Sequence, residues 1–227
     1  RNNDKAQGGW SLEKTDLTIK CASEDLWQAS QSELGGSPGN QNSLQIPYTS
    51  DSPPFVKSVQ YHNSNKITLF FSKNITFYHL RSNLEIEKIL FTIHQDRAII
   101  YFRNEMQKGV NYKIFIDQLQ DCLFNTHQDD TVWFGIPSTN LSGLKVNEIL
   151  FDPSSDGCDY LELYNTSSLP QSISNIRIAN VNPVDLLPEN LVITSQDSFL
   201  IPPLSYFVFT PYPERITALY SGPNKPI

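Results

Sequence analysis

Residues 144–165 constrain the fold of this chain more than any other segment. They read LKVNEILFDPSSDGCDYLELYN, in which two short apolar runs flank a turn rich in Asp, Pro, Ser and Gly. The first run spans residues 144–150 and the second spans residues 160–164. Apolar runs of this length around such a turn predict a β-hairpin or a pair of sandwich strands.

The same signals recur through residues 46–138. Short runs enriched in β-branched and aromatic residues occupy positions 55–61, 66–71, 84–86, 88–93, 97–102 and 111–116. Along the last of these, Tyr112, Ile114 and Ile116 share one face of an extended chain and form the expected core stripe. Six or seven short strands separated by turns predict an all-β sandwich.

The chain is long enough for two compact domains, and its composition argues against several functions. Of its 227 residues, 39% are hydrophobic and 18% are charged, which is not a disordered composition. Its 15 prolines and 13 phenylalanines favour short strands and turns over long helices. The net charge of -7 argues against nucleic acid and anionic membranes as partners, because both need a basic surface. No apolar run approaches the roughly 18 residues that cross a bilayer, so no direct membrane span is expected.

The segment 144–165 also resembles the opening of a lamin tail domain as found in secreted proteins of Bacteroidota. That family pattern runs V-x-N-E-I-L-F-[DN]-P and continues, after the turn, as G-x-D-[FY]-[VL]-E-[IL]-Y-N. The residues that fill it are Asn147, Glu148, Ile149, Leu150, Phe151, Asp152, Pro153, Gly157, Asp159, Tyr160, Glu162, Tyr164 and Asn165. The resemblance implies an immunoglobulin-like binding or spacer module rather than an enzyme.

Residues 1–45 resemble the closing part of the same family. Such domains end with a W-S-L-E strand, a Cys, W-x-A-S and a G-G-[ST]-P-G-x-x-N-S segment. The matching residues are Trp10, Ser11, Leu12, Glu13, Cys21, Trp27, Ala29, Ser30, Gly35, Gly36, Ser37, Pro38, Gly39, Asn42 and Ser43. This resemblance implies a C-terminal piece of a lamin tail-like domain, followed by a linker rich in Gly, Pro, Asn and Ser.

Residues 46–138 resemble a bacterial immunoglobulin-like domain of the type seen in surface-layer and adhesin proteins. Those domains carry V-x-S-V and I-x-[LV]-x-F-S near the start, and G-x-x-Y-x-[IL]-x-[IV] with D-x-x-G-N near the end. The matching residues are Val56, Ser58, Val59, Ile67, Leu69, Phe71, Ser72, Gly109, Tyr112, Ile114, Ile116, Asp121, Cys122 and Asn125. Phe124 stands where that family has Gly.

Residues 139–227 resemble the N-terminal part of a lamin tail-like domain. Pro202, Pro203 and residues 206–210 resemble its [LF]-x-P-G-x-[FY]-x-V-[LF]-T segment, with Leu204 in place of the usual Gly. The closing strands of the domain are missing from this part of the chain. We therefore expect a neighbouring polypeptide, further residues, or packing of residues 1–45 onto residues 139–227. The chain begins at Arg1 without a methionine, and we interpret it as a trimmed product or as part of a longer protein.

The three cysteines, Cys21, Cys122 and Cys158, leave two interpretations open. None belongs to a C-x-x-C pair and no His lies at metal-ligand spacing, so a zinc site is not expected. All three could be buried free thiols. In an exported protein, two of them could instead form a disulfide.

Two groups of acidic residues are candidates for chemistry. Asp152, Asp156 and Asp159 lie in one turn and could bind Ca²⁺ through oxygen ligands, although ordinary turn hydrogen bonding explains them and the strict calcium-loop pattern is absent. Glu148 and Glu162 lie on adjacent predicted strands, where a carboxylate pair could serve acid–base work. Both glutamates belong to the structural pattern of the family, so we expect no catalytic residue, no cofactor and no bound metal.

The remaining candidates are scattered. His62, His79, His94 and His127 have irregular spacing, and neither a phosphate loop nor a G-x-S-x-G elbow is present. The triplet 130–132 resembles the O-glycosylation acceptor of exported Bacteroidota proteins, with Thr131 modified. The triplets at Asn74, Asn140 and Asn165 formally match N-glycosylation but are expected to be accidental. Six aromatics could form a binding platform, although core packing explains them as well: Trp10, Trp27, Phe70, Phe71, Tyr206 and Phe209.

Together these patterns predict tandem immunoglobulin-like β-sandwiches, with boundaries near residues 45 and 138. The expected function is a non-catalytic interaction or scaffold protein, exported to the cell surface or outer membrane of Bacteroidota, or to the periplasm or medium. Its expected partners are protein subunits of an outer-membrane or surface complex, bound at sheet edges and loops. The alternatives are an accessory binding or anchoring region of a secreted hydrolase or nuclease, and an adhesin stalk.

Overall fold

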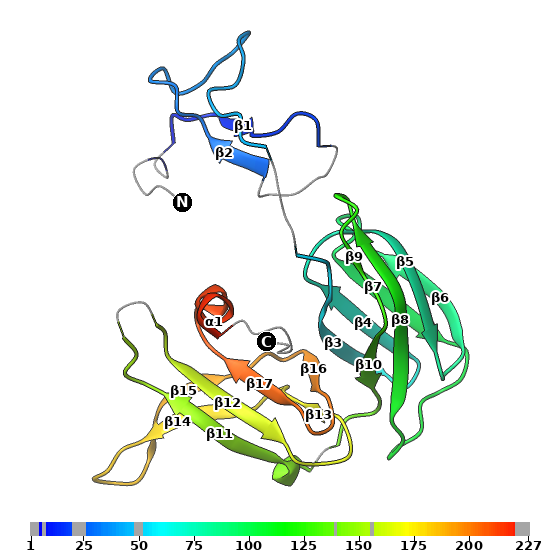
Figure 1. The fold of residues 1–227 in the computed structure, drawn as a ribbon. Helices are drawn as coiled ribbons and strands as arrows, with labels where there is room; N and C mark the ends of the chain where they lie inside the picture. Colours follow the sequence, from blue (N-terminus) through cyan, green and yellow to red (C-terminus); the bar gives the residue numbers. More distant parts are fainter. Residues whose placement is uncertain are drawn as a thin grey trace.

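The computed structural model describes residue 5 and residues 8–19, 26–47, 52–138, 140–154 and 157–220 (Figure 1). These residues form an all-β chain of antiparallel sheets, as the sequence predicts. Within them, seventeen strands are accompanied by one eight-residue helix, α1 (Pro213–Tyr220). No helix in these ranges is long and apolar enough to cross a membrane.

Two sheets from the middle of the chain enclose one hydrophobic core. The first has the strand order β13-β16-β3-β4-β7-β6 and the second has the order β10-β8-β5, with β9 attached to β8. The strands that the middle of the chain supplies to them are β3 (Val56–Asn63), β4 (Lys66–Phe71), β5 (Ile75–Ser82), β6 (Ile86–Phe91), β7 (Arg97–Phe102), β8 (Tyr112–Asp121), β9 (Thr126–His127) and β10 (Asp130–Phe134).

The core between these sheets is built from alternating side chains. The predicted stripe of Tyr112, Ile114 and Ile116 on β8 is buried, which confirms that prediction. Phe102 on β7 stacks on Phe134 of β10, with ring centroids 4.9 Å apart, so the two sheets are in direct contact. Burial of such large aromatic side chains stabilises a domain by several kcal/mol in total, at roughly 25 cal/mol per Å² of apolar surface.

Three strands of the second sheet, β5, β9 and β10, were not predicted from the sequence. β5 pairs with β8 along its length, but its register shifts between Ile75 and Phe77 and again between His79 and Leu80. The first shift inserts Thr76 into β5 and reverses which face the following β5 side chains occupy, whereas the second inserts Asp117 into β8. The strand therefore lacks the two-residue hydrophobic period by which strands are recognised in a sequence.

Strand β16 (Ser198–Ile201) crosses the boundary that the sequence predicts near residue 138. It pairs antiparallel with β3 through Ser198–Tyr61 and Phe199–Gln60, and Leu200 belongs to the core described above. β13 (Gln171–Ser172) pairs with β16 on its other side. The C-terminal region therefore extends the sheet of the middle region by two strands. The predicted boundary itself stays a prediction.

The rest of the C-terminal region forms two smaller sheets. β11 (Leu144–Leu150), β12 (Tyr160–Asn165) and β17 (Tyr206–Phe209) form a three-stranded sheet in that order. The antiparallel pairing of β11 with β12 confirms the strand pair predicted from residues 144–165. β14 (Arg177–Val181) and β15 (Pro188–Ile193) form a separate two-stranded sheet.

The N-terminal region is organised around the buried carboxylate of Glu13. Glu13 lies on β1 (Leu12–Lys14), which pairs with β2 (Trp27–Ala29). Its carboxylate accepts hydrogen bonds from Ser37 Oγ, Ser43 Oγ and Ser43 N, each at 2.7 Å. These donors, with Ser37 contributing most, lower the pKa of Glu13 from 4.5 to about 2. The hydrogen bonds of this one ionised side chain therefore hold the segment around residues 37–44 against β1 and β2.

We expect this region to lose stability in acid. The folded pKa of Glu13 lies below its unfolded value, so its contribution is complete above about pH 4.5 and is lost as the pH falls towards about 2. The fluorescence of Trp10 and Trp27, followed against pH, measures this loss. Glu13→Gln should flatten the profile over that interval, whereas Glu33→Gln, an exposed carboxyl in the same region, should keep it. An unchanged profile in Glu13→Gln would remove Glu13 from this role.

Phe124 and Leu204, the two residues at which the sequence departs from the glycines of the resembled patterns, have left-handed backbone. Phe124 has φ 66° and Leu204 has φ 53°, and both side chains are exposed. This region of backbone space favours glycine because a Cβ atom is strained there. The backbone at both positions therefore keeps the conformation that a glycine would adopt most easily.

Phe124→Gly is expected to stabilise the chain. Relief of left-handed strain, worth roughly 1–2 kcal/mol, exceeds the entropy cost of glycine, roughly 0.5–1 kcal/mol. The net gain of roughly 0.5–1 kcal/mol corresponds to a rise in Tm of about 2–3 °C in a calorimetric scan. Phe124→Ala removes the same ring but keeps the Cβ atom, so it should give no gain. Equal Tm values for the two variants would contradict the strain argument.

Candidate interaction surface

The hairpin of β14 and β15 carries a dense group of exposed apolar side chains. Seven of its large aliphatic side chains are more than half exposed, with Val184 reaching 89%. They are Val181, Val184, Leu186, Leu187, Leu191, Val192 and Ile193. Isolated two-stranded sheets are marginal in water, and exposed apolar patches of this kind mark interaction sites. This hairpin is therefore a candidate for contact with a partner.

A second open surface lies along β11. In the described chain β11 is an edge strand, paired only with β12. Val146 lies opposite Leu163, and Ile149 lies opposite Leu161, so these four side chains share one face of the sheet. Leu163 is buried, but Val146 and Ile149 are 60% and 59% exposed. The apolar face is thus covered over β12 and open over β11.

The opposite face of β11 carries two carboxylates in register. Glu148 and Glu162 are direct cross-strand neighbours, in agreement with the prediction that they lie on adjacent strands. Tyr160 donates a hydrogen bond to Glu148 Oε1 at 2.5 Å, and Asn147 Nδ2 donates to Glu162 Oε1 at 2.7 Å. The bond to Glu148 raises the pKa of the Tyr160 phenol well above its usual range. Neither carboxylate forms an ion pair with a described Lys, Arg or His.

The register of these carboxylates comes from a β-bulge. The pairing shifts between Val146 and Glu148, so that no residue of β12 lies directly opposite Asn147. Without this extra residue, Glu148 would lie on the face that carries Val146. The bulge therefore separates the outer strand into an apolar face and an acidic face.

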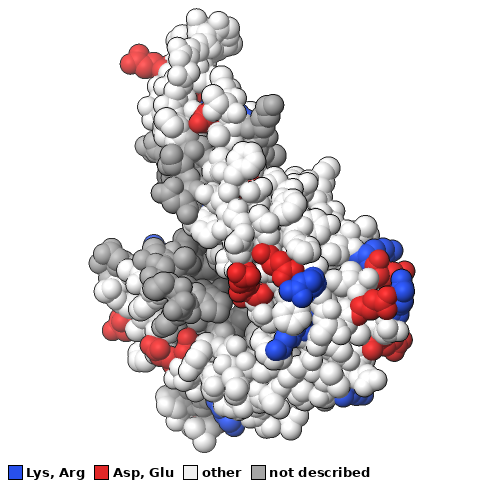
Figure 2. Space-filling model, turned by 45° about the vertical axis from the view of Figure 1, so that its right-hand side comes forward, with Lys and Arg blue, Asp and Glu red and all other residues white. Residues whose placement is uncertain are grey.

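The negative charge of the chain is concentrated in the region that carries both open surfaces. Residues 139–227 contain four Lys or Arg and nine Asp or Glu, giving -5 of the total charge of -7. On the face drawn in Figure 2, Lys and Arg lie beside Asp and Glu rather than in one continuous basic patch. A partner of this region would be favoured by positive charge.

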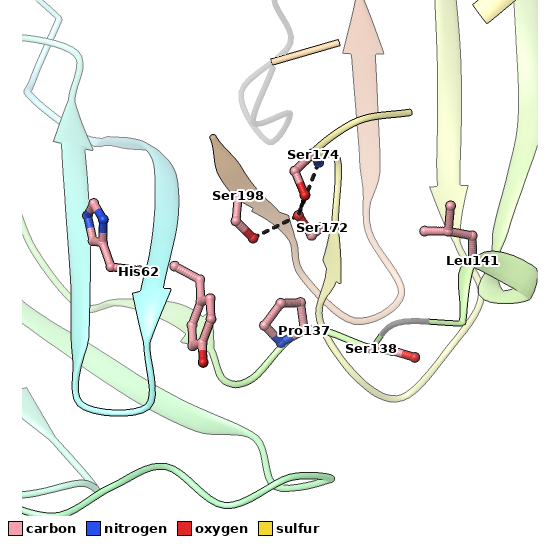
Figure 3. A pocket seen from close by; sticks show the side chains of 8 residues that line it. His62, Pro137, Ser138, Leu141, Ser172, Ser174 and Ser198 are labelled. Atoms are coloured by element: carbon pink, nitrogen blue, oxygen red, sulfur yellow. Dashed lines mark hydrogen bonds between the residues drawn. The ribbon is translucent and has the colours of Figure 1, made fainter. Parts of the chain in front are cut away.

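A cleft of about 420 Å³ lies where the C-terminal region joins β3 (Figure 3). It is lined by Tyr61, His62, Pro137, Ser138, Leu141, Ser172, Ser174 and Ser198. The hydroxyl of Ser172 is hydrogen-bonded to Ser174 Oγ at 2.9 Å and to Ser198 Oγ at 2.8 Å. Ser172 and Ser174 lie on one segment and Ser198 on another, and no motif marks either of them, so the cleft could not be predicted from the sequence.

The cleft lacks the arrangement of a serine nucleophile and its base. A base must lie within hydrogen-bond reach of the hydroxyl that it activates. Among the described residues, the His62 ring is instead hydrogen-bonded to Thr68 Oγ1 at 2.8 Å. Burial, assisted by Lys66, lowers the pKa of His62, while Asp197 opposes that shift. The cleft presents hydroxyls that suit a polar group, and it carries no argument for catalysis.

The structure places the other sequence candidates apart. Asp152 and Asp159 are exposed and Asp156 lies outside the described residues, so the calcium alternative stays a prediction. No group of three or more His, Cys, Asp or Glu in the described ranges could hold a metal ion. Thr131 is exposed on β10, and its glycosylation also stays a prediction. The proposed aromatic platform is divided: Trp27 lies on β2, Phe70 and Phe71 on β4, and Tyr206 and Phe209 on β17.

The cysteines differ from one another. Cys122 is disulfide-bonded, whereas Cys158 is a buried free thiol. Cys158 Sγ lies 3.4 Å from Thr210 Oγ1, beside the start of β12. Cys21 lies outside the described residues. The described residues thus contain one disulfide-bonded cysteine and one free thiol, and the pattern over all three cysteines stays a prediction.

A scan against protein-family models finds no match for this chain, and neither does a search of the curated proteins. The lamin tail and immunoglobulin-like resemblances accordingly stay predictions, and the structure shows a chain of several antiparallel sheets with two open surfaces.

Proposed function

We propose that this chain is a non-catalytic interaction module, which binds a protein partner through the open sheet surfaces of its C-terminal region. The single observation that carries the proposal is the exposed hairpin of β14 and β15, whose aliphatic side chains face water on both sides of a two-stranded sheet. A soluble monomer rarely leaves so much contiguous apolar surface uncovered. Contact with a partner removes that surface from water.

The finer architecture belongs to the same proposal. We infer tandem immunoglobulin-like sandwiches, in which the middle region is complete and the outer regions are of lamin tail type. The shared core of two antiparallel sheets supports the middle part of this assignment. The left-handed backbone at Phe124 and Leu204, where the two families have glycine, supports the register of both resemblances.

The proposed location is outside the cytoplasm, at a cell surface or outer membrane. The support for it is the disulfide at Cys122, because disulfides form and persist in oxidising compartments. The proposed partners are therefore protein subunits of a surface assembly.

The test is cross-linked purification of the chain from its native membrane fraction, with partners identified by mass spectrometry and re-bound in purified form. Substitution of Leu191, Val192 and Ile193 by Thr keeps β-propensity but removes apolar surface, and it should weaken re-binding at least about tenfold. Leu34→Thr with Ile93→Thr, two exposed apolar side chains elsewhere, is the matched control and should bind normally. If the chain purifies alone and stays monomeric at every concentration, the proposal is wrong.

A further inference from the structure

We propose that the free edge of β11 receives a β-strand from a partner protein, and that this strand is basic on the side that meets Glu148 and Glu162. This inference rests on the proposed function and specifies the chemistry of the partner. It concerns β11 alone and makes no use of the β14–β15 hairpin.

The first argument is the unpaired backbone. Within the described ranges β11 is the outer strand of the order β11-β12-β17, so half of its N–H and C=O groups point away from the sheet. Natural sheets protect such edges with charges, prolines, bulges or covering segments. β11 has a bulge at Asn147, but it continues as a paired strand on both sides of that bulge, from Leu144 to Leu150. An edge of this length is a template for strand addition.

The second argument is the side-chain pattern that the edge presents. On one face, Val146 and Ile149 are exposed where the neighbouring Leu163 is already buried. A strand added at the edge would place every second side chain on this face, where apolar residues would extend the row from Leu161 and Leu163 outwards. The intervening side chains would lie on the face of Glu148 and Glu162.

The third argument is charge. Like charges directly opposite one another on paired strands are unfavourable, yet Glu148 and Glu162 occupy such positions. The nearest basic position on the same strand is Lys145, which lies opposite Tyr164 and forms no ion pair with a described carboxylate. A Lys or Arg on the incoming strand would neutralise this repulsion. The surrounding charge of -5 in residues 139–227 favours the same sign of partner.

The charge also disfavours a second copy of this edge as the occupant. Two β11 edges brought together would add a second pair of glutamates to the first, in a region that is already acidic. Like-charge juxtaposition across an interface opposes association. The occupant is therefore a strand of a different sequence, apolar on one face and basic on the other.

The experiment uses the whole chain and a pair of synthetic strand peptides. In one peptide Lys alternates with Val and Ile, and in its twin Glu replaces every Lys. Fluorescence anisotropy should show the basic peptide binding at least about tenfold more tightly than the twin, with a preference that shrinks as salt is added. Glu148→Lys with Glu162→Lys should reverse the preference. Glu87→Lys, on the exposed edge strand β6 of another sheet, is the matched control and should leave the preference unchanged.

Two further probes separate strand addition from simple charge attraction. A basic peptide with Ser in place of Val and Ile should bind at least about tenfold more weakly, because it lacks the apolar face. N-methylation at every second residue removes the backbone N–H donors on one side of the peptide strand. Of two such peptides, methylated at the odd or at the even positions, the one that loses the donors facing β11 should not bind. Glu148→Gln with Glu162→Gln keeps the hydrogen-bond acceptors and should remove the preference for Lys, even if the charge-reversed variant does not fold.

The outcomes are distinct from those of the proposed function. Equal binding of the two peptides, or equal effects of the β11 and Glu87 variants, would overturn the basic-strand inference. So would concentration-dependent self-association of the chain that Glu148→Gln with Glu162→Gln strengthens, since the occupant would then be a second copy. In each case, loss of partner binding on substitution of Leu191, Val192 and Ile193 would still support the interaction module.

Discussion

Asn165→Asp is expected to unfold the three-stranded sheet, although it exchanges only an amide NH₂ for an oxygen. The fully buried Asn165 donates from Nδ2 to the carbonyl oxygens of Leu169 at 2.9 Å, Ile201 at 3.1 Å and Pro202 at 2.9 Å. An Asp there would turn a carboxylate oxygen towards three carbonyl oxygens. The cost of an uncompensated buried charge is about 3–5 kcal/mol.

Hydrogen exchange measured by mass spectrometry over β12 and β17 checks this expectation. The free energy of protection against exchange in these two strands should fall by about 3–5 kcal/mol. Protection in β8 should stay closer to that of the parent chain. Asn175→Asp makes the same chemical change at an exposed turn and should alter stability by no more than about 0.5 kcal/mol. Comparable protection in the two variants would show that the buried amide is not what organises this corner.

Asp121→Ala is expected to be the most damaging substitution in the middle region. The buried carboxylate of Asp121 accepts hydrogen bonds from Leu123 N at 2.9 Å, Asn125 N at 3.0 Å and Asn125 Nδ2 at 3.0 Å. Lys73 Nζ lies 3.4 Å away on the other side. Removing the carboxylate takes an acceptor from two backbone amides and a counter-charge from a lysine, at a cost of about 3–5 kcal/mol.

Urea denaturation followed by the fluorescence of Trp133 measures this loss. Asp117→Ala provides the comparison, because Asp117 lies on the same strand and is partly exposed, where it pairs with the exposed Arg81 at 2.6 Å. Surface pairs contribute little to stability, so the Asp117 variant should be far less damaged. If the two substitutions cost the same, burial of Asp121 does not explain its importance.

The local pattern predicted some strands closely and missed others for identifiable reasons. Residues 66–71 and 97–102 were predicted with the limits that β4 and β7 have, because each is a short β-rich run bounded by turn residues. β5 was missed because a bulge at Thr76 interrupts its two-residue hydrophobic period. The pairing of β16 with β3 joins residues far apart in the sequence, and nothing in either strand alone specifies that partner.

The candidate surface was predictable only in part. Two adjacent strands that carry Glu148 and Glu162 could be read from the segment 144–165, and their antiparallel register brings the glutamates together. The solvent exposure of the apolar side chains could not be predicted, because apolar residues such as Val192 and Ile149 are usually buried. Whether an apolar side chain is covered depends on which strands surround it, and this is a property of the assembled sheets.

The pairing of β16 with β3 also sets the order of events during synthesis. Gln60 and Phe199 are separated by about 140 residues, so at roughly 5–20 residues per second β3 waits on the order of ten seconds or more for its neighbour. Over that interval the nascent chain carries an unpaired β3 edge, and the core lacks the contribution of Leu200. The middle sheet can therefore be completed only after residues 198–201 have been synthesised. A nascent chain on a ribosome stalled before residue 198 would still expose this β3 edge. That edge would be prone to pair with other nascent chains on the same messenger RNA.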